Sequence, residues 1–431
     1  MTSVSNPEEH LQAVSSYYGK ELQSTSDLKT SACCPVGTAP PPEHLAVLKQ
    51  LHPEVTEKFY GCGSPIPPHV EDATVLDLGC GTGRDVYLLS GLVGTKGRVI
   101  GVDMTKEQLD VAREHQDYHA KVLLNGADSN VELRHGYIED LEGAGVEESS
   151  VDIVISNCVC NLSPDKKKVF SQVARALKDG GEFYFSDIYA DRRLSEEAQK
   201  DKDLVGECLG GALYLNDFVS ILREAGLSDP RIVSAAAVQV EDERLKGLVP
   251  DVQFYSLTVR IFKLPRESLE SELEEYGETA TYNGPKEKFV YDSIFTFAKG
   301  QAQKVDATTA EVLRRSRYAQ FFEVSARGPH RGIFAPKSYF PSIAFMLRAA
   351  LPASEDTSAN GQATSGCCGS NSSVAGQKAQ SAKQNQTSNG CCGPKAKAKT
   401  PSANRCCAPK SSPTPSAKAS SCCSAKKRSC C

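Results

Sequence analysis

The stretch Val75-Leu-Asp-Leu-Gly-Cys-Gly-Thr-Gly-Arg84 decides the fold of this chain. An apolar run that contains Asp77 is typical of a buried parallel strand, and the glycine-rich residues after it predict a sharp turn into a helix. Gly79, Gly81 and Gly83 allow backbone dihedrals that other residues avoid, and they let a ligand approach the main chain without a Cβ in the way. The stretch therefore predicts a ligand-binding loop after the first strand of an α/β sheet.

The residues of this loop also indicate its ligand. The loop lacks the Lys-Ser/Thr pair of phosphate-binding loops, which disfavours ATP and GTP. It resembles the first motif of class I S-adenosylmethionine-dependent methyltransferases. The next apolar run, residues 98–104, supports this resemblance, because its Asp103 lies about 20 residues further on, where an acid holds ribose hydroxyls. An ordinary NAD-binding fold is the alternative.

The chain has 431 residues, enough for several domains. Residues 72–227 alternate strand-like and helix-like runs, so we expect an α/β fold with a doubly wound sheet. The resemblance of the glycine loop implies that this is the Rossmann-like sheet of a class I methyltransferase. The expected segments are an N-terminal helical segment with a cysteine loop (1–71), the S-adenosylmethionine-binding domain (72–230), a C-terminal α+β domain (231–350) and a disordered tail rich in Ser, Lys and paired Cys (351–431). The strand-like runs 231–240 and 252–264 are assigned to the α+β domain, and single helices are expected over 43–60 and 105–124.

Charge and hydropathy limit the partners of the protein. The net charge is −5, but from Ser354 onward eleven Lys and Arg face two acids, so the tail carries +9 and the rest −14. An acidic body disfavours nucleic acid as a partner. No apolar stretch approaches the ~20 residues of a membrane span, and the first residues lack the features of a signal peptide. We expect a cytoplasmic monomer that is not bound to a membrane and whose thiols are mostly reduced.

The 17 cysteines are distributed unevenly, and ten of them form adjacent pairs after residue 366. Cys158 follows the expected fourth strand, at the sheet edge where open α/β sheets bind ligands. Cys208 follows the fifth strand in a glycine-rich segment, so these two thiols are expected to converge. Cys62, together with Cys33 or Cys34 on a Pro-rich loop, could supply a third and a fourth thiol. Such thiols suit a soft, thiophilic centre; a zinc site made of four cysteines is the alternative, although no CxxC pair is present.

Several motifs together resemble those of arsenite methyltransferases over residues 10–325. They lie at residues 28–33, 60–63, 77–85, 156–162, 185–187, 206–213, 280–284 and 316–318. The resemblance implies that the catalytic, arsenic-binding thiols are Cys62, Cys158 and Cys208, which would ligate As(III), with an N-terminal thiol at either Cys33 or Cys34. Cys80 and Cys160 are expected to be packing residues.

The resemblance also implies S-adenosyl-L-methionine as the cofactor. Gly79, Gly81 and Gly83 are expected to border its methionine part, and Asp103 its ribose. The remaining expected cofactor-binding residues are Asp77, Arg84, Met104, Ile138, Glu139 and Asn157. Two alternatives stay open, because Glu139 could be a solvated acid at a strand end and Arg84 could cap a helix with Asp85.

Trivalent arsenic held by thiolates keeps a lone pair and can itself attack a sulfonium methyl, so no general base is needed. The tasks left to the protein are to orient the arsenical and to exclude water. We expect Cys158 and Cys208 to suffice for a methylated arsenical, and Cys62 to be needed for the first methylation. A thiol reductant, glutathione or thioredoxin, is the expected partner.

Two other functions fit parts of the sequence. A methyltransferase for an organic small molecule would leave the placement of Cys158 and Cys208 unexplained. A thiol-rich metal-binding protein would leave the glycine loop and Asp103 unexplained. The cysteine pairs of the tail could gather arsenicals by raising the local thiol concentration, or the tail could be a low-complexity extension without such a role.

Overall fold

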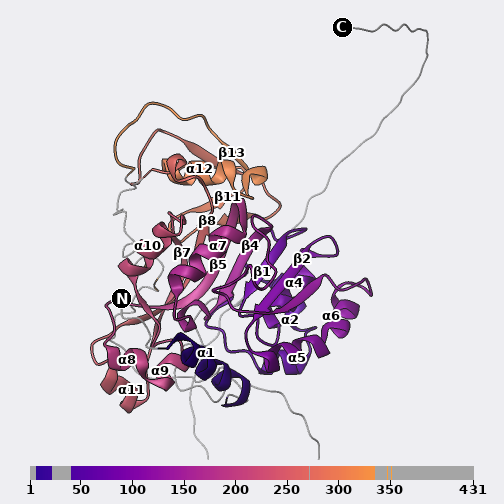
Figure 1. Cartoon of the computed structure of the whole chain (residues 1–431). Coiled ribbons are helices and arrows are strands. Elements are labelled where there is room, and N and C mark those ends of the chain that lie inside the picture. The colour runs from indigo at the N-terminus through magenta and orange to yellow at the C-terminus, as the bar shows by residue number, and fades with distance from the viewer. Residues whose placement is uncertain (1–5, 22–39, 271, 335–346, 348–350, 352–431) are drawn as a thin grey trace, which may run out of the picture. The chain divides into compact units, whose positions relative to one another are not determined.

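A mixed eight-stranded sheet is the main element of the computed structural model (Figure 1). Its strands are β1 (Thr74–Leu78), β2 (Arg98–Asp103), β3 (Val131–His135), β4 (Val151–Asn157), β5 (Leu177–Ala190), β6 (Leu213–Tyr214), β7 (Arg231–Val238) and β8 (Phe254–Phe262). The order is β3-β2-β1-β4-β5-β8-β7, with β6 paired to β5. Strands β1 to β5 are parallel, whereas β8 is antiparallel to β5 and β7. The predicted Rossmann-like methyltransferase sheet is confirmed.

The structure describes residues 6–21, 40–270, 272–334, 347 and 351. These residues belong to one compact unit, Met1–Cys367. The predicted tail beyond residue 351 and both cysteines of the Pro-rich loop, Cys33 and Cys34, lie outside the described residues. Among the helices that the structure describes, none is long and apolar enough to cross a membrane.

Two apolar cores cover the two faces of the sheet, because successive side chains of a strand point to opposite faces. Val75 of β1 packs on the side of α4 and α5, and its neighbour Leu76 packs on the side of α7 and α10. These helices are α4 (Arg84–Val93), α5 (Lys106–Glu114), α7 (Lys166–Ala176) and α10 (Leu215–Glu224). Because β1, β2, β4 and β5 are parallel, the loops that leave their carboxyl ends meet at one edge of the sheet.

Two strands expected in the C-terminal domain belong to this sheet instead. The runs 231–240 and 252–264 form β7 and β8, and β8 inserts between β5 and β7. Leu257, Val259 and Ile261 of β8 pack in the core on the side of α7 and α10, and most of the strand is buried. The alternation of apolar residues predicts a strand but not its partner, which is why the sequence did not place β8 in the main sheet, between β5 and β7.

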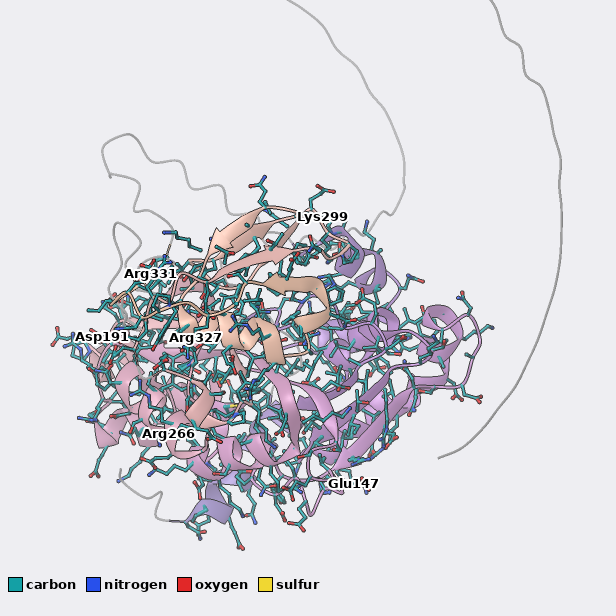
Figure 2. The ribbon with its side chains drawn as sticks, turned by 90° about the horizontal axis from the view of Figure 1, so that it is seen from above. Glu147, Asp191, Arg266, Lys299, Arg327 and Arg331 are labelled. Atoms are coloured by element: carbon teal, nitrogen blue, oxygen red, sulfur yellow. A yellow bond between two sulfur atoms is a disulfide. The ribbon has the colours of Figure 1, made fainter. Side chains whose placement is uncertain are left out.

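The remaining C-terminal residues form smaller sheets with a core of their own. Strands β9 (Thr279–Tyr282), β12 (Ala302–Lys304) and β13 (Phe322–Val324) make one sheet, β10 (Lys288–Val290) and β11 (Thr296–Ala298) make another, and α12 (Ala307–Arg315) packs beside them. Viewed from above, charged side chains such as Arg327 and Lys299 lie at the surface of this part of the unit (Figure 2).

A buried ionic cluster joins the C-terminal part to the main sheet. Glu182 of β5 is fully buried and accepts hydrogen bonds from Arg260 Nε and Arg317 Nε, both at 2.8 Å, and from the Tyr318 hydroxyl at 2.8 Å. Arg317 also donates to the main-chain carbonyl of Pro68 at 2.7 Å. The cluster therefore fixes the segment that follows Cys62.

Both long helices expected on either side of the glycine loop are broken. In place of 43–60 the chain forms α2 (Pro42–Leu48) and α3 (Pro53–Glu57), because Pro53 has no N–H to continue the first helix and starts a new one. In place of 105–124 it forms α5 and α6 (Gln116–Leu123), which divide at His115. The N-terminal segment forms α1 (Pro7–Ser16) and the π-helical turn η1 (Tyr17–Glu21).

Candidate active site

The glycine loop makes the first wall of a pocket at the carboxyl edge of the sheet. Gly79, Gly81 and Gly83 have φ values of +65°, +53° and +88°, which favour glycine. A Cβ on Gly79 would lie 2.5 Å from the Val159 side chain, so no larger residue fits. The loop thus brings its main chain to the pocket as the sequence predicts.

The Asp103 side chain holds the main chain of the glycine loop in place. Its carboxylate accepts hydrogen bonds from the N–H of Gly81 at 2.8 Å and from that of Thr105 at 2.7 Å. Burial raises the pKa of Asp103, and it raises that of the fully enclosed Asp77 well above its usual value, assisted by the nearby carboxylates of Asp85 and Asp103. Two carboxyl groups at the ends of neighbouring strands thus face one pocket.

The loops after β2 and β3 bring three of the expected cofactor-binding residues to the pocket. Met104, Ile138 and Glu139 all line it. The Glu139 side chain is buried and accepts a hydrogen bond from Ser163 Oγ, which opposes the alternative of a solvated acid. Ser163 lines the pocket as well, and no sequence pattern indicated this role. It lies just before α7, whose N-cap is Asp165, which accepts a hydrogen bond from the N–H of Lys168.

Arg84 and Asn157 connect the pocket to the turn that carries Cys62. The Arg84 guanidinium pairs with Asp85 at 2.7 Å and lies 3.9 Å above the Phe59 ring. Asn157 Nδ2 donates to Asp85 at 2.9 Å and to the carbonyl of Gly63 at 3.0 Å, and its Oδ1 accepts from the Gly63 N–H at 3.1 Å. Both side chains line the pocket, and together they fix residues 59–63 against it.

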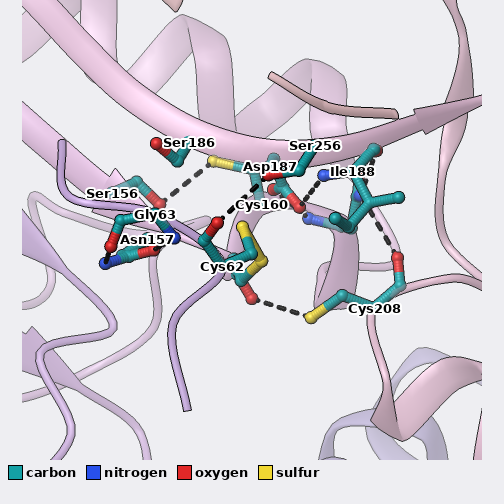
Figure 3. Close-up of a disulfide and its surroundings, with 12 residues drawn as sticks. Cys62, Gly63, Ser156, Asn157, Cys160, Ser186, Asp187, Ile188, Cys208 and Ser256 are labelled. Carbon is teal, nitrogen blue, oxygen red and sulfur yellow. Dashed lines mark hydrogen bonds between the residues drawn. A yellow bond between two sulfur atoms is a disulfide. The ribbon is translucent and has the colours of Figure 1, made fainter. Parts of the chain in front are cut away.

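Three cysteine side chains lie together beside this pocket, in one buried cluster: Cys62, Cys158 and Cys208 (Figure 3). Cys62 and Cys158 are joined by a disulfide with a Cα–Cα distance of 5.6 Å. The Cys208 thiol donates to the carbonyl of Cys158 at 2.9 Å. The structure thus brings together three of the predicted thiols, while Cys33 and Cys34 lie outside the described residues.

The disulfide differs from the expectation that these thiols are reduced. Cys62 lies within bonding range of Cys158 because its carbonyl accepts from Ser256 Oγ at 3.1 Å and the next residue, Gly63, is held by Asn157. Both contacts are long-range, so the sequence could not show that Cys62 and Cys158 come this close.

Cys158 and Cys208 share an unusual backbone conformation. Their φ values are +59° and +61°, a left-handed region that residues other than glycine rarely adopt. Such strained residues cluster at functional sites, where the surrounding structure holds them in place. Here the conformation is maintained on one side by the Cys158 N–H, which donates to the carbonyl of Ser186 at 2.8 Å.

The other two described cysteines are packing residues, as predicted. Cys160 is buried under β4, with its sulfur 3.5 Å from Ser156 Oγ, and burial raises its pKa to about 12. Cys80 is enclosed against Gly101, where an added Cβ would lie 2.8 Å from its sulfur, and burial raises its pKa well above the usual range. High pKa values oppose a thiolate at either position.

The N-terminal helix supplies pocket residues that the sequence did not reveal. Leu11 and Val14 of α1 and Tyr18 of η1 line the pocket, and so does Gln108 of α5. The helical spacing of Leu11, Val14 and Tyr18 was the available signal, but such a stripe most often marks a core face.

The sheet order, the glycine loop with its paired carboxylates and the enclosed pocket define a class I S-adenosylmethionine-dependent methyltransferase. Residues 69–226 match the family model "Methyltransferase domain", and residues 278–374 match "Arsenite methyltransferase C-terminal domain". The chain belongs to the arsenite methyltransferase family.

Similarity to individual proteins extends over most of the chain. An arsenite methyltransferase of Aquipseudomonas alcaligenes is 46% identical, over 75% of this chain and 93% of its own. The human arsenite methyltransferase is 43% identical, over 73% and 84%. The crystal structure of an arsenic(III) S-adenosylmethionine methyltransferase from Chlamydomonas reinhardtii has 45% identity and a TM-score of 0.66, covering 69% of this chain and all of that one.

Proposed function

We propose that this protein methylates trivalent arsenic, as arsenite or its thiol conjugate and as methylarsenite, with S-adenosylmethionine as methyl donor and detoxification as the result. The observation that carries the proposal is the position of Cys158. It lines the cofactor pocket, and it touches both of the other thiols of the cluster. An arsenical held there by sulfur lies at the wall of the methyl-donor pocket.

The pocket suits S-adenosylmethionine in shape and polarity. Gly81 leaves room for a ligand against the main chain, Asp103 and Glu139 offer carboxylate acceptors, and Met104 and Ile138 offer apolar surface. When bound, S-adenosylmethionine supplies a sulfonium-activated methyl group that the lone pair of a thiolate-bound arsenical can attack. The residues of the pocket bind the cofactor and the arsenical, orient them and shield them from water. No side chain is required as a base.

The disulfide supports a requirement for a thiol reductant. Cys62 and Cys158 cannot bind arsenic while their sulfurs are joined. Two electrons and two protons from a dithiol such as reduced thioredoxin, or from two molecules of glutathione, open the bond to two thiols, and the reductant leaves as a disulfide. Each arsenic–sulfur bond then forms as an arsenic–oxygen bond breaks, and the thiol proton departs with the hydroxide as water.

We assign different roles in arsenic binding to Cys62, Cys158 and Cys208. Cys158 and Cys208 hold the arsenical in every methylation, since Cys208 lies against the loop of Cys158. Cys62, on a separate segment, is the third ligand for arsenite, which has no methyl group. Cys33 or Cys34 remains the proposed fourth thiol.

One incubation tests this function. The full-length protein is mixed with arsenite, methyl-labelled S-adenosylmethionine and a thiol reductant, and the arsenic species are separated. We expect labelled methylarsenicals that disappear when the reductant is omitted. Label in an added quinone or sterol but not in arsenic would favour the organic-substrate alternative, and tight arsenite binding without transfer would favour a metal-binding protein.

A further inference from the structure

The N-terminal helix α1 forms a wall of the cofactor pocket that the sheet does not provide. Val14 is almost completely buried, and it lines the pocket together with Leu11. The His10 ring nitrogen Nε2 is 2.9 Å from the carbonyl of Leu162, in the loop after β4. The helix is therefore attached to the same loop that presents Cys158.

The turn η1, at the end of this helix, is held between the cofactor side and the thiol side of the site. A Cβ on Gly206 would lie 2.6 Å from the Tyr17 ring, so the ring packs directly on the main chain that precedes Cys208. A Cβ on Gly19 would lie 3.1 Å from Thr105, which follows the cofactor loop of β2. The two close approaches hold η1 against the segment before Cys208 and against the start of α5.

Tyr18 makes polar contacts in both of these directions. Its hydroxyl donates to the carbonyl of Gly206 at 2.7 Å and lies 3.9 Å from the Cys208 sulfur. Its own carbonyl accepts from Gln108 Nε2 at 2.7 Å. A phenol hydroxyl has one proton and two acceptor lone pairs, so a small rotation turns its proton from the Gly206 carbonyl to a thiolate.

Gln108 extends this chain of contacts into the cofactor pocket. The residue is buried and lines the pocket, and its Oε1 has no hydrogen-bond partner among the residues that the structure describes. A buried acceptor without a partner is costly. Its position suits a donor group of a bound ligand, and the ammonium, ribose hydroxyls and adenine amino group of S-adenosylmethionine are such donors.

We propose that Tyr18 is a positioning residue for the Cys208 thiolate and that Gln108 holds it in register with the cofactor. In its thiol form, Cys208 donates a hydrogen bond to the Cys158 carbonyl. That hydrogen bond is lost once the sulfur is deprotonated and binds arsenic. The Tyr18 hydroxyl then becomes the donor to this sulfur, and Gln108 fixes the Tyr18 main chain from the pocket side. The inference extends the proposed function, because it assigns Cys208 a supporting residue at the arsenic site.

The test measures Cys208 itself, independently of arsenic chemistry. The full-length protein is alkylated with iodoacetamide, and the rate at Cys208 is followed by peptide mass spectrometry. We expect Tyr18→Phe to slow alkylation of Cys208 at pH 7.5 by about tenfold, as befits loss of a hydrogen bond to a charged group. In methylation assays the variant should raise the KM for arsenite with little change in affinity for S-adenosylmethionine.

Two further variants keep the test decisive. Gln108→Leu removes the bond to the Tyr18 carbonyl, so it should slow Cys208 alkylation several-fold and also weaken S-adenosylmethionine binding, as measured by calorimetry. Tyr118→Phe is the control, because Tyr118 is an exposed residue whose hydroxyl also donates to a main-chain carbonyl, that of Gln50, away from the pocket.

The outcomes separate this inference from the proposed function. Unchanged Cys208 alkylation in folded Tyr18→Phe would overturn the role of Tyr18, even if the wild-type protein methylates arsenite. Slowed alkylation in a protein without arsenite methylation would support the role of Tyr18 and reject the proposed function. If Tyr18→Phe does not fold, the alkylation rate in Gln108→Leu decides.

Discussion

The Asn157 side chain holds the main chain of Gly63 at both of its polar groups, with contacts of 3.1 Å to the N–H and 3.0 Å to the carbonyl. Asn157 ends β4 and directly precedes Cys158, while Gly63 directly follows Cys62. Two cysteines 96 positions apart in the chain are thereby brought to one place.

We predict that Asn157→Ala loosens this arrangement. The substitution leaves a partly buried N–H and carbonyl of Gly63 without their partner, which costs about 1–3 kcal/mol in the free energy of unfolding. Methylation of arsenite, which needs Cys62, should fall more than methylation of methylarsenite. Urea unfolding and assays with the two substrates measure both effects.

Asn130→Ala is the matched control for this substitution. Its amide also bonds main-chain carbonyls, those of Ser90 and Gly94, but away from the site. It should lower stability without changing the ratio of the two activities. An equal loss of both activities in Asn157→Ala would contradict a specific role at Cys62.

We predict that methylation of arsenite and methylation of methylarsenite require different sets of cysteines. Cys158→Ser and Cys208→Ser should abolish both methylations, because a serine hydroxyl does not replace a thiolate as a ligand for arsenic. Cys62→Ser should lose methylation of arsenite and keep that of methylarsenite, measured by separating the arsenic species. Normal arsenite methylation by Cys62→Ser would reject this division of labour, and Cys160→Ala, a packing variant, serves as control.

The buried cluster around Glu182 is predicted to be critical for stability. Glu182→Gln leaves the two guanidinium groups of Arg260 and Arg317 in a buried position without their carboxylate, which costs about 3–5 kcal/mol. Glu224→Gln breaks only an exposed pair with Lys167 and should cost under about 1 kcal/mol. Urea unfolding midpoints compare the two, and similar midpoints would contradict the assignment.

His119 makes the stability of the protein depend on pH. Burial lowers its pKa to about 4, against ~6.5 for an unfolded chain. Its Nε2 accepts from the His52 N–H at 3.1 Å, a contact that a protonated ring would lose. Because the unfolded state takes up a proton first, the free energy of unfolding should fall as the pH drops from about 6.5 to about 4.

The variant His119→Asn removes this titration. Its loss of stability relative to wild type should be largest at pH 7 and should shrink toward pH 4.5, as followed by urea unfolding at several pH values. The exposed His330 supplies the control substitution. A difference that stays constant over this range would reject His119 as the origin of the slope.

The sequence predicts the cofactor half of the site better than the thiol half. Residues 75–84 and Asp103 act locally, through glycine conformations and strand ends, so their pattern can be recognised along the chain. The positions of Cys62 and β8 depend on long-range partners, Asn157 and β5, which no local pattern specifies. The left-handed conformations of Cys158 and Cys208 also follow from their surroundings, because cysteine does not favour them.

The arrangement of β8 has a consequence for synthesis on the ribosome. The Cys62 carbonyl accepts a hydrogen bond from Ser256 of β8. In the segment after Cys62, the carbonyl of Pro68 accepts a hydrogen bond from Arg317. A nascent chain that has emerged to residue 230 already contains every residue assigned to the cofactor, but Cys62 has not yet received these two anchors. The methyl-donor pocket can therefore form before the last two anchors of the Cys62 segment are in place.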